Sequence, residues 1–215
     1  MKSFAKITNK KILILAPHAD DGELGCGGSI SKFLEQKNDV YYICFSICED
    51  SVPKGFAKNQ LEVELKKATH YLGIKKSNLI IHYYKVRNLY LYRQEILEKL
   101  INIRNTLRPN VIFMPSSFSL HQDHILIYQE GLRSFKHCSC FGYDLPWDNI
   151  EFKTSAFIEL QKRHIETKSK ALSFYKTQKS RGYCSRDYVF SLAKIRGGQI
   201  KSNYAESFEN IRIIL

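Results

Sequence analysis

Apolar and polar positions follow two alternating patterns through the first 135 residues. Short apolar runs typical of buried strands lie at residues 11–16, 40–47, 79–84 and 111–114. Between these runs, apolar residues recur at helical spacing over residues 28–36, 60–72 and 93–107. This alternation predicts an α/β fold with a mainly parallel sheet and helices on both faces, in a Rossmann-like, doubly wound arrangement.

The second half of the chain has a less regular pattern. Residues 139–149, SCFGYDLPWDN, have the composition of a loop that carries aromatic side chains. The pattern predicts a helix over residues 159–179 and late strands over residues 188–195 and 211–215. Since no linker, repeat or low-complexity segment interrupts the sequence, we expect a single domain over residues 1–215.

Composition is ordinary for a globular protein except for its charge. Of 215 residues, 44% are apolar and 25% are charged, with no apolar run of membrane-spanning length and no secretory signal, so we expect a cytoplasmic protein. The six cysteines lack paired C-x-x-C spacing, which favours reduced thiols. The net charge is 33 − 21 = +12, but the lysines are scattered. This favours a solvated surface, then an anionic substrate or peripheral membrane contact, and specific nucleic-acid binding last.

Polar clusters follow two of the predicted strands at the point where each strand ends. Together they carry three histidines and three carboxylates: His18, Asp20, Asp21, His121, Asp123 and His124. Because the carboxyl ends of parallel strands share one edge of a sheet, we expect these side chains to lie close together. Imidazole and carboxylate suit Zn²⁺ or a similar divalent ion, and one of the two adjacent aspartates could bind the metal while the other faces its water.

The competing interpretation is that each cluster is only a loop or a helix cap. An aspartate pair after a strand, taken alone, is more often a turn, and an isolated HxDH is more often a surface loop. The glycines of GELGCGG also lack the G-x-G-x-x-G spacing of dinucleotide-binding folds. Two histidine–carboxylate clusters that each follow a buried strand are harder to explain as unrelated caps, so we favour a metal site.

Two motifs resemble those of a known family. PHADDGELGCGG at residues 17–28 resembles the PHPDDE-x-x-GCGG motif of the PIG-L/LmbE-like family of zinc-dependent N-acetylglucosaminyl deacetylases, and LHQDH at residues 120–124 resembles its HxDH motif. Further similarity lies at residues 64–73, 93–100 and 204–214, so that it extends over nearly the whole chain. The resemblance implies a Rossmann-like fold and removal of an acetyl group from an amino sugar.

The resemblance also implies a role for each residue of the two clusters. The implied Zn²⁺ ligands are His18, Asp21 and His124. Asp20 would be the general base, His121 would stabilise the oxyanion or protonate the leaving amine, and Asp123 would orient a histidine. The same ligands would also accept iron or cobalt.

The first motif departs from the family pattern at two positions. Ala19 replaces a proline that the chemistry does not need. Gly22 replaces a glutamate, for which Glu23 is a candidate substitute one position later. This departure is the only support for the alternative function, a catalytically inactive sugar-binding or scaffold protein that retains the fold.

Residues that contact the sugar are less clearly marked. Arg93, Arg87 and Asp50 could contact sugar hydroxyls or a phosphate, or could form surface ion pairs. Tyr143 and Trp147 could form a wall of the sugar pocket, or could anchor a hydrophobic loop. The substrate could be a glycan, a lipid-linked or nucleotide-linked sugar, or a small glycoside.

Overall fold

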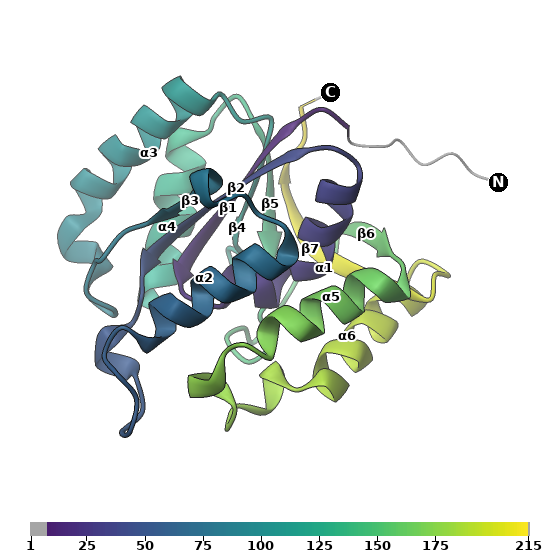
Figure 1. Ribbon diagram of the computed structural model, residues 1–215. Helices are drawn as coiled ribbons and strands as arrows, with labels where there is room; N and C mark the ends of the chain where they lie inside the picture. The colour runs from purple at the N-terminus through teal and green to yellow at the C-terminus, as the bar shows by residue number, and fades with distance from the viewer. Residues whose placement is uncertain (1–7, 215) are drawn as a thin grey trace.

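The computed structural model describes residues 8–214, in which a central sheet lies between two groups of helices (Figure 1). The strands are β1 (Lys11–His18), β2 (Asp39–Ser46), β3 (Leu79–Ile81), β4 (Val111–Pro115), β5 (Ser139–Tyr143), β6 (Ala156–Leu160) and β7 (Tyr204–Arg212). The helices are α1 (Asp21–Glu35), α2 (Gln60–Leu72), α3 (Arg93–Leu107), α4 (Gln122–Ser134), α5 (Lys162–Leu172) and α6 (Arg186–Gly198). The predicted α/β fold is confirmed, while a single domain over residues 1–215 stays a prediction.

The order of the strands determines where a ligand site forms. The sheet runs β3-β2-β1-β4-β5-β7-β6, with β1 to β5 parallel and β7 antiparallel to both of its neighbours. β1 therefore lies between β2 and β4, and the helices that follow β1 and β4, α1 and α4, cover opposite faces of the sheet. Such an arrangement opens a crevice at the carboxyl ends of the two central strands, where ligands bind in open α/β sheets.

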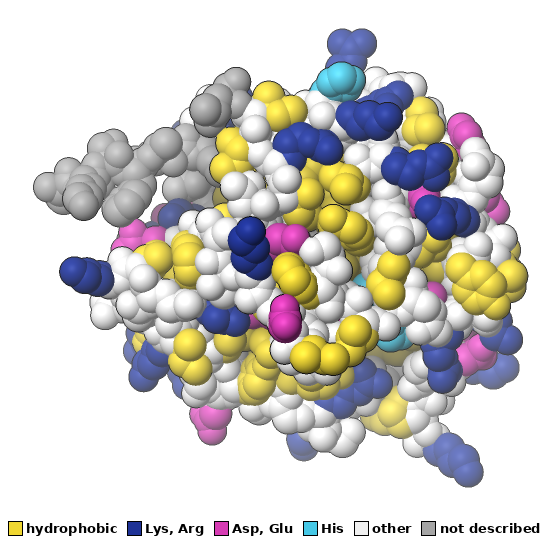
Figure 2. All heavy atoms as spheres, turned by 180° about the vertical axis from the view of Figure 1, so that it is seen from behind, with side chains coloured by type: hydrophobic (Ala, Val, Ile, Leu, Met, Phe, Trp, Pro, Cys, Tyr) yellow, Lys and Arg dark blue, Asp and Glu magenta, His cyan; other side chains and the backbone are white. Residues whose placement is uncertain are grey.

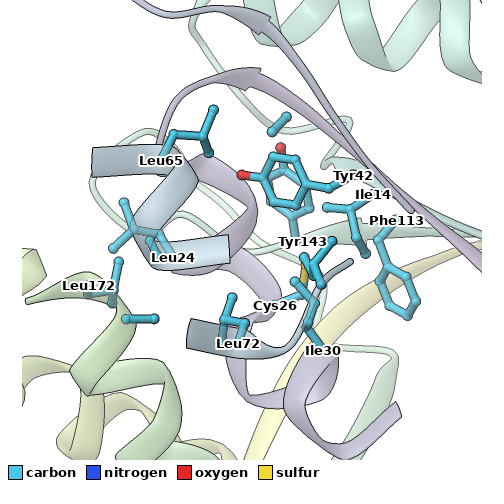
Figure 3. Close-up of a cluster of buried hydrophobic side chains, with 14 of the residues drawn as sticks. Ile14, Leu24, Cys26, Ile30, Tyr42, Leu65, Leu72, Phe113, Tyr143 and Leu172 are labelled. Atoms are coloured by element: carbon cyan, nitrogen blue, oxygen red, sulfur yellow. The ribbon is translucent and has the colours of Figure 1, made fainter. Parts of the chain in front are cut away.

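The side chains of β1 alternate between two hydrophobic cores. Ile12, Ile14 and Ala16 belong to a core with residues of α1, α2, α5 and α6. Leu13 and Leu15 face the opposite side of the sheet and belong to a core with residues of α3 and α4. Figure 3 shows Ile14 in the first core, next to Tyr42 of β2 and Phe113 of β4. Because both faces of β1 are covered, the strand is a continuous apolar run up to His18.

The predicted strand over residues 188–195 is wrong, since this segment lies inside α6. Its aromatic and β-branched residues suggested a strand, but its buried positions are Val189, Phe190 and Ala193, which share one helical face. Ser185 caps the helix, because its Oγ accepts a hydrogen bond from the backbone N–H of Tyr188.

Other boundaries differ by several residues. The helix expected to begin at residue 28 begins at Asp21, so the first cluster lies in its first turn. The expected helix over residues 159–179 is divided into the end of β6, α5 and a 3₁₀ turn over residues 176–178. The last strand was expected over residues 211–215, but β7 begins at Tyr204 and ends at Arg212. Leu215, the final residue of the expected strand, lies outside the described residues.

The surface agrees with the scattered charge of the sequence. Figure 2 shows Lys and Arg side chains at many separate places on one face, among apolar and neutral groups. Within residues 8–214, no helix combines the length and apolar character needed to cross a bilayer. All six cysteines are free, and five of them are buried.

Candidate metal centre and active site

The two predicted clusters meet at the carboxyl ends of β1 and β4. His18 is the last residue of β1, and Asp21 begins α1 after a turn at Asp20, whose φ of 91° is in the left-handed region. His121 caps α4, and His124 lies in its first turn. A non-glycine residue in the left-handed region carries strain, which is often found at functional sites.

Three donor atoms of the clusters form a nearly equilateral triangle. Nδ1 of His18 lies 3.2 Å from Oδ2 of Asp21, Nε2 of His124 lies 3.2 Å from the same oxygen, and the two nitrogens are 3.2 Å apart. Ligands about 2.0–2.1 Å from a tetrahedral Zn²⁺ are separated by about 3.3 Å. The spacing and chemistry of these three atoms therefore fit a zinc-sized ion with one open position.

Each histidine of this triangle also has a carboxylate on its other ring nitrogen. Oδ2 of Asp123 lies 2.9 Å from Nε2 of His18, and Oδ2 of Asp148 lies 3.0 Å from Nδ1 of His124. Asp123 is fully buried and accepts hydrogen bonds from the backbone N–H groups of Arg87 and Leu89. Such outer carboxylates orient metal-binding imidazoles and raise their basicity.

The protonation of this cluster also favours a cation. Burial raises the pKa of Asp21, but the charge and contacts of His124 and His18 outweigh it and hold that pKa far below its ordinary value. Burial lowers the pKa of His124, but Asp21 and Asp148 outweigh it and raise the pKa to about 10. The carboxylates therefore stabilise positive charge at the position that a metal ion would occupy.

A second group of three donors shares two members with this triangle. One nitrogen each of His18, His121 and His124 lies within 4.8 Å of the other two. The Asp21 triangle is tighter and includes an anionic ligand, so we favour it. His121 then remains available for the substrate.

Asp20 differs from its neighbour Asp21 in having no hydrogen bond to its carboxylate among the described residues. It is 6% exposed and lines the pocket beside the histidines. Burial, followed by the charges of Asp21 and Glu23, raises its pKa well above the ordinary value. A buried carboxylate with a raised pKa and free oxygens is suited to accept a proton.

His121 presents one particular nitrogen to the pocket. The backbone N–H of Asp123 donates a hydrogen bond to Nδ1 of His121, so the ring proton of neutral His121 lies on Nε2. Burial, followed by the charges of His18 and His124, lowers the pKa of His121. The neutral ring can therefore donate a hydrogen bond through Nε2 without first being charged.

Comparisons with known proteins show the family to which the chain belongs. The sequence profile of the PIG-L family, described as GlcNAc-PI de-N-acetylase, matches residues 13–134, which include both clusters. The chain belongs to the PIG-L family. Diacetylchitobiose deacetylase of Thermococcus kodakarensis is 29% identical over 122 residues, which cover 54% of this chain and 44% of that relative. The match thus spans less than half of the relative's length.

Solved structures confirm the fold of this PIG-L protein. N,N'-diacetylchitobiose deacetylase from Pyrococcus horikoshii superposes with a TM-score of 0.78 at 20% identity, covering 93% of this chain and 83% of that one. GalB, the 4-carboxy-2-hydroxymuconate hydratase from Pseudomonas putida, has a TM-score of 0.78 at 17% identity, covering 96% and 98%. The fold therefore occurs with more than one reaction, and residues at the site must decide the activity.

A pocket of about 320 Å³ opens over the clusters of this PIG-L protein. Of the predicted substrate residues, Arg87 and Trp147 line it. Asp148, Arg181 and Tyr183 also line it, and sequence reasoning missed them. A neighbouring cavity between α1, α5 and α6 measures only about 20 Å³ and contains none of the six cluster residues.

The other three predicted substrate residues lie outside this pocket. Arg93 forms an ion pair with Glu130 on α4, and Asp50 lies on the surface, 3.6 Å from Nζ of Lys85. Tyr143 is buried in the core, where its hydroxyl donates a hydrogen bond to the carbonyl of Leu15. Two of these residues serve in ion pairs and one in packing.

The departure of Gly22 from the PIG-L motif has a steric cause. A Cβ at this position would lie 2.5 Å from the ring of Tyr42, so only glycine fits beside this ring. Glu23 faces away from the pocket, because its carboxylate accepts hydrogen bonds from the hydroxyls of Tyr42 and Tyr175. Gly22 thus accommodates Tyr42, and Glu23 binds two buried tyrosines without lining the pocket.

Proposed function

We propose that this protein is a metal-dependent hydrolase that removes the acetyl group from an N-acetylated amino sugar. The observation that carries the proposal is the triangle of His18, Asp21 and His124 beside the unpartnered carboxylate of Asp20. The names of the deacetylase relatives support an acetylated sugar as substrate. The cytoplasmic location of the protein and its peripheral membrane contact stay predictions from the sequence.

The bound ion, for which we favour zinc, would polarise the amide carbonyl and lower the pKa of a water molecule. Asp20 has the free carboxylate oxygens and the raised pKa to take a proton from the attacking water. Neutral His121, through Nε2–H, would donate a hydrogen bond to the developing oxyanion. The proton that Asp20 takes from the water would then pass to the departing amine. The products are acetate and a free amino sugar.

Two other functions compete with this proposal. The Pseudomonas putida neighbour shows that a hydratase can have the same fold, but it shares only 17% identity with this chain. A catalytically inactive sugar-binding or scaffold protein would not need a buried, unpartnered carboxylate at Asp20 beside a complete donor triangle. The hydrolase therefore explains both the donor triangle and the buried carboxylate of Asp20, whereas an inactive protein explains neither.

The test combines metal analysis with acetate release. The purified protein should contain about one divalent ion per chain and should release acetate from at least one N-acetylglucosamine derivative, with loss of release in a chelator and recovery with added zinc. A folded protein that takes up no metal would overturn the proposal. Bound metal without acetate release from any derivative would favour the inactive protein or the hydratase.

A further inference from the structure

Two exposed arginines line the mouth of the pocket above the buried clusters. Arg87 follows β3, and Arg181 lies between α5 and α6, so separate segments carry them to the same pocket. His18 and Asp20, at the reactive end, are only 9% and 6% exposed. The pocket therefore has a buried end that carries the predicted chemistry and a positively charged mouth.

Neither guanidinium forms an ion pair within residues 8–214. Arg163 and Arg196, in contrast, form ion pairs with Glu35 and Asp144. The carboxylates that line the pocket are engaged elsewhere or lie deeper. Asp21 and Asp148 contact the histidines, and Asp20 attracts Arg181 through space without forming an ion pair.

The contacts that hold the two arginines in place leave both guanidinium groups without a carboxylate partner among the described residues. Nη1 of Arg181 donates a hydrogen bond of 2.6 Å to the hydroxyl of Tyr183, and the ring of Tyr183 stacks on Trp147 with centroids 3.8 Å apart. Arg87 has a φ of 67°, and its backbone N–H donates to Asp123. The backbone of Arg87 and the Tyr183 ring beside Arg181 are thus held in place. Nitrogens of both guanidinium groups remain free for a ligand.

We propose that Arg87 and Arg181 form a subsite for an anionic oxyacid group, phosphate or carboxylate, carried by the sugar. Guanidinium groups bind such anions through paired, charge-assisted hydrogen bonds. The acetamido group would lie at the buried end and the anionic group at the mouth, so the two ends of one substrate would be recognised separately. This inference rests on the proposed function and narrows its substrate class to acidic amino sugars.

The test compares neutral and acidic substrates in matched variants. The probes are N-acetylglucosamine, its 1-phosphate and 6-phosphate, and N-acetylmuramic acid, which separate phosphate from carboxylate and one position from another. The variants are Arg87→Gln and Arg181→Gln, with Arg186→Gln as control, because Arg186 is exposed and lies over Phe190 outside the pocket. We expect at least one acidic sugar to have a kcat/KM roughly tenfold or more above that of the neutral sugar.

The variants should remove this preference by raising KM for the acidic sugar far more than for the neutral sugar, and the Arg186→Gln control should keep the preference. The preference should also weaken with salt, because both arginines are exposed. Acetate release without a preference, or a preference that survives both substitutions, would overturn the subsite and leave the deacetylase intact.

Calorimetric binding at equal metal content keeps the subsite testable if no sugar releases acetate. Tighter binding of an acidic sugar than of the neutral one, lost in the arginine variants, would support the subsite while the proposed activity fails. Equal binding of inorganic phosphate and the acidic sugar to wild type and both variants would mean that the anion binds the metal, and would overturn the subsite.

Discussion

Oδ2 of Asp148 lies 3.0 Å from Nδ1 of His124, on the ring nitrogen that does not face Asp21. Asp148 is itself held by Ser119, whose hydroxyl donates a hydrogen bond to the same oxygen. Because Asp123 contacts His18 in the same manner, both candidate histidine ligands have a carboxylate behind them. The site thus has an outer layer that fixes the direction of its donor atoms.

Replacing Asp148 should weaken metal binding without unfolding the protein. We expect Asp148→Ala to lower metal affinity by about 10–100-fold and Asp148→Asn to lower it less, since an amide oxygen can still accept from Nδ1–H. Competition with a chromogenic chelator measures the affinity. Asp50→Asn is the control, because Asp50 lies on the surface outside the pocket. Equal affinities in Asp148→Ala and the control would contradict the role of Asp148.

Asp20→Asn should abolish most activity while retaining the metal. Asparagine tolerates the left-handed φ of 91° at this position, so the backbone strain stays unchanged. Loss of a general base lowers kcat by about 10²–10⁴-fold. Acetate release and metal content, measured on the same preparation, check this expectation. Near-normal kcat in Asp20→Asn would exclude Asp20 as the base.

Asp21→Ala and His121→Ala distinguish the two possible sets of metal ligands. If Asp21 completes the triangle, Asp21→Ala should lose the metal, whereas His121→Ala should keep it and lose kcat. The three-histidine set predicts the reverse for metal content. Metal analysis after dialysis against dilute chelator separates them. Metal loss in His121→Ala alone would move His121 from the substrate to the ligand set.

The sequence was sufficient to place the six cluster residues, because each cluster directly follows a buried strand of the parallel sheet. It could not reveal Asp148, because the composition of residues 139–149 predicted only a loop with aromatic side chains and gave no signal for a carboxylate at the site. Arg181 and Tyr183 were hidden for a similar reason, since their segment was expected to follow a continuous helix. Residues that reach a site from irregular segments leave no periodic signal, and only tertiary packing places them.

Tyr143 shows the opposite error. An aromatic residue in a loop-like segment suggested a sugar contact, but Tyr143 ends β5 and packs in the core. A Cβ added to Gly25 would lie only 2.5 Å from the ring of Tyr143, so the ring packs directly against this glycine. The glycine of the first motif and the distant tyrosine thus form one packing contact, which spacing along the chain cannot show.

Stability should depend on acid pH through Glu35. The hydrogen bonds from Arg163, followed by the contact with His164, lower the pKa of Glu35 from 4.5 to about 2. Its stabilisation is therefore present above pH 4.5 and is lost as pH falls toward 2. Urea unfolding of wild type and Glu35→Gln should differ by less than about 1 kcal/mol near neutral pH, because Glu35 is exposed, and by less still near pH 3. A difference that grows on acidification would contradict this sign.

Glu206 should contribute more to stability than any surface carboxylate, because it joins a kink in α1 to α5. Cys26 has non-helical angles, and beyond it the backbone N–H groups of Gly28 and Ser29 donate to the two carboxylate oxygens of Glu206. Nζ of Lys168 lies 2.7 Å from Oε1 of Glu206, and both side chains are 7% exposed. The carboxylate thus caps a helix segment and neutralises a buried ammonium group.

Glu206→Gln should therefore lower the free energy of unfolding by about 3–5 kcal/mol, since it leaves Lys168 charged and buried. The control is Glu166→Gln on α5, which removes an exposed pair with Lys162 and should cost less than about 0.5 kcal/mol. Adding Lys168→Met to Glu206→Gln should recover part of the loss, because the uncompensated charge is then absent. Urea unfolding of the four proteins, including wild type, measures each free energy. Equal losses in Glu206→Gln and Glu166→Gln would mean that water or another group compensates Lys168.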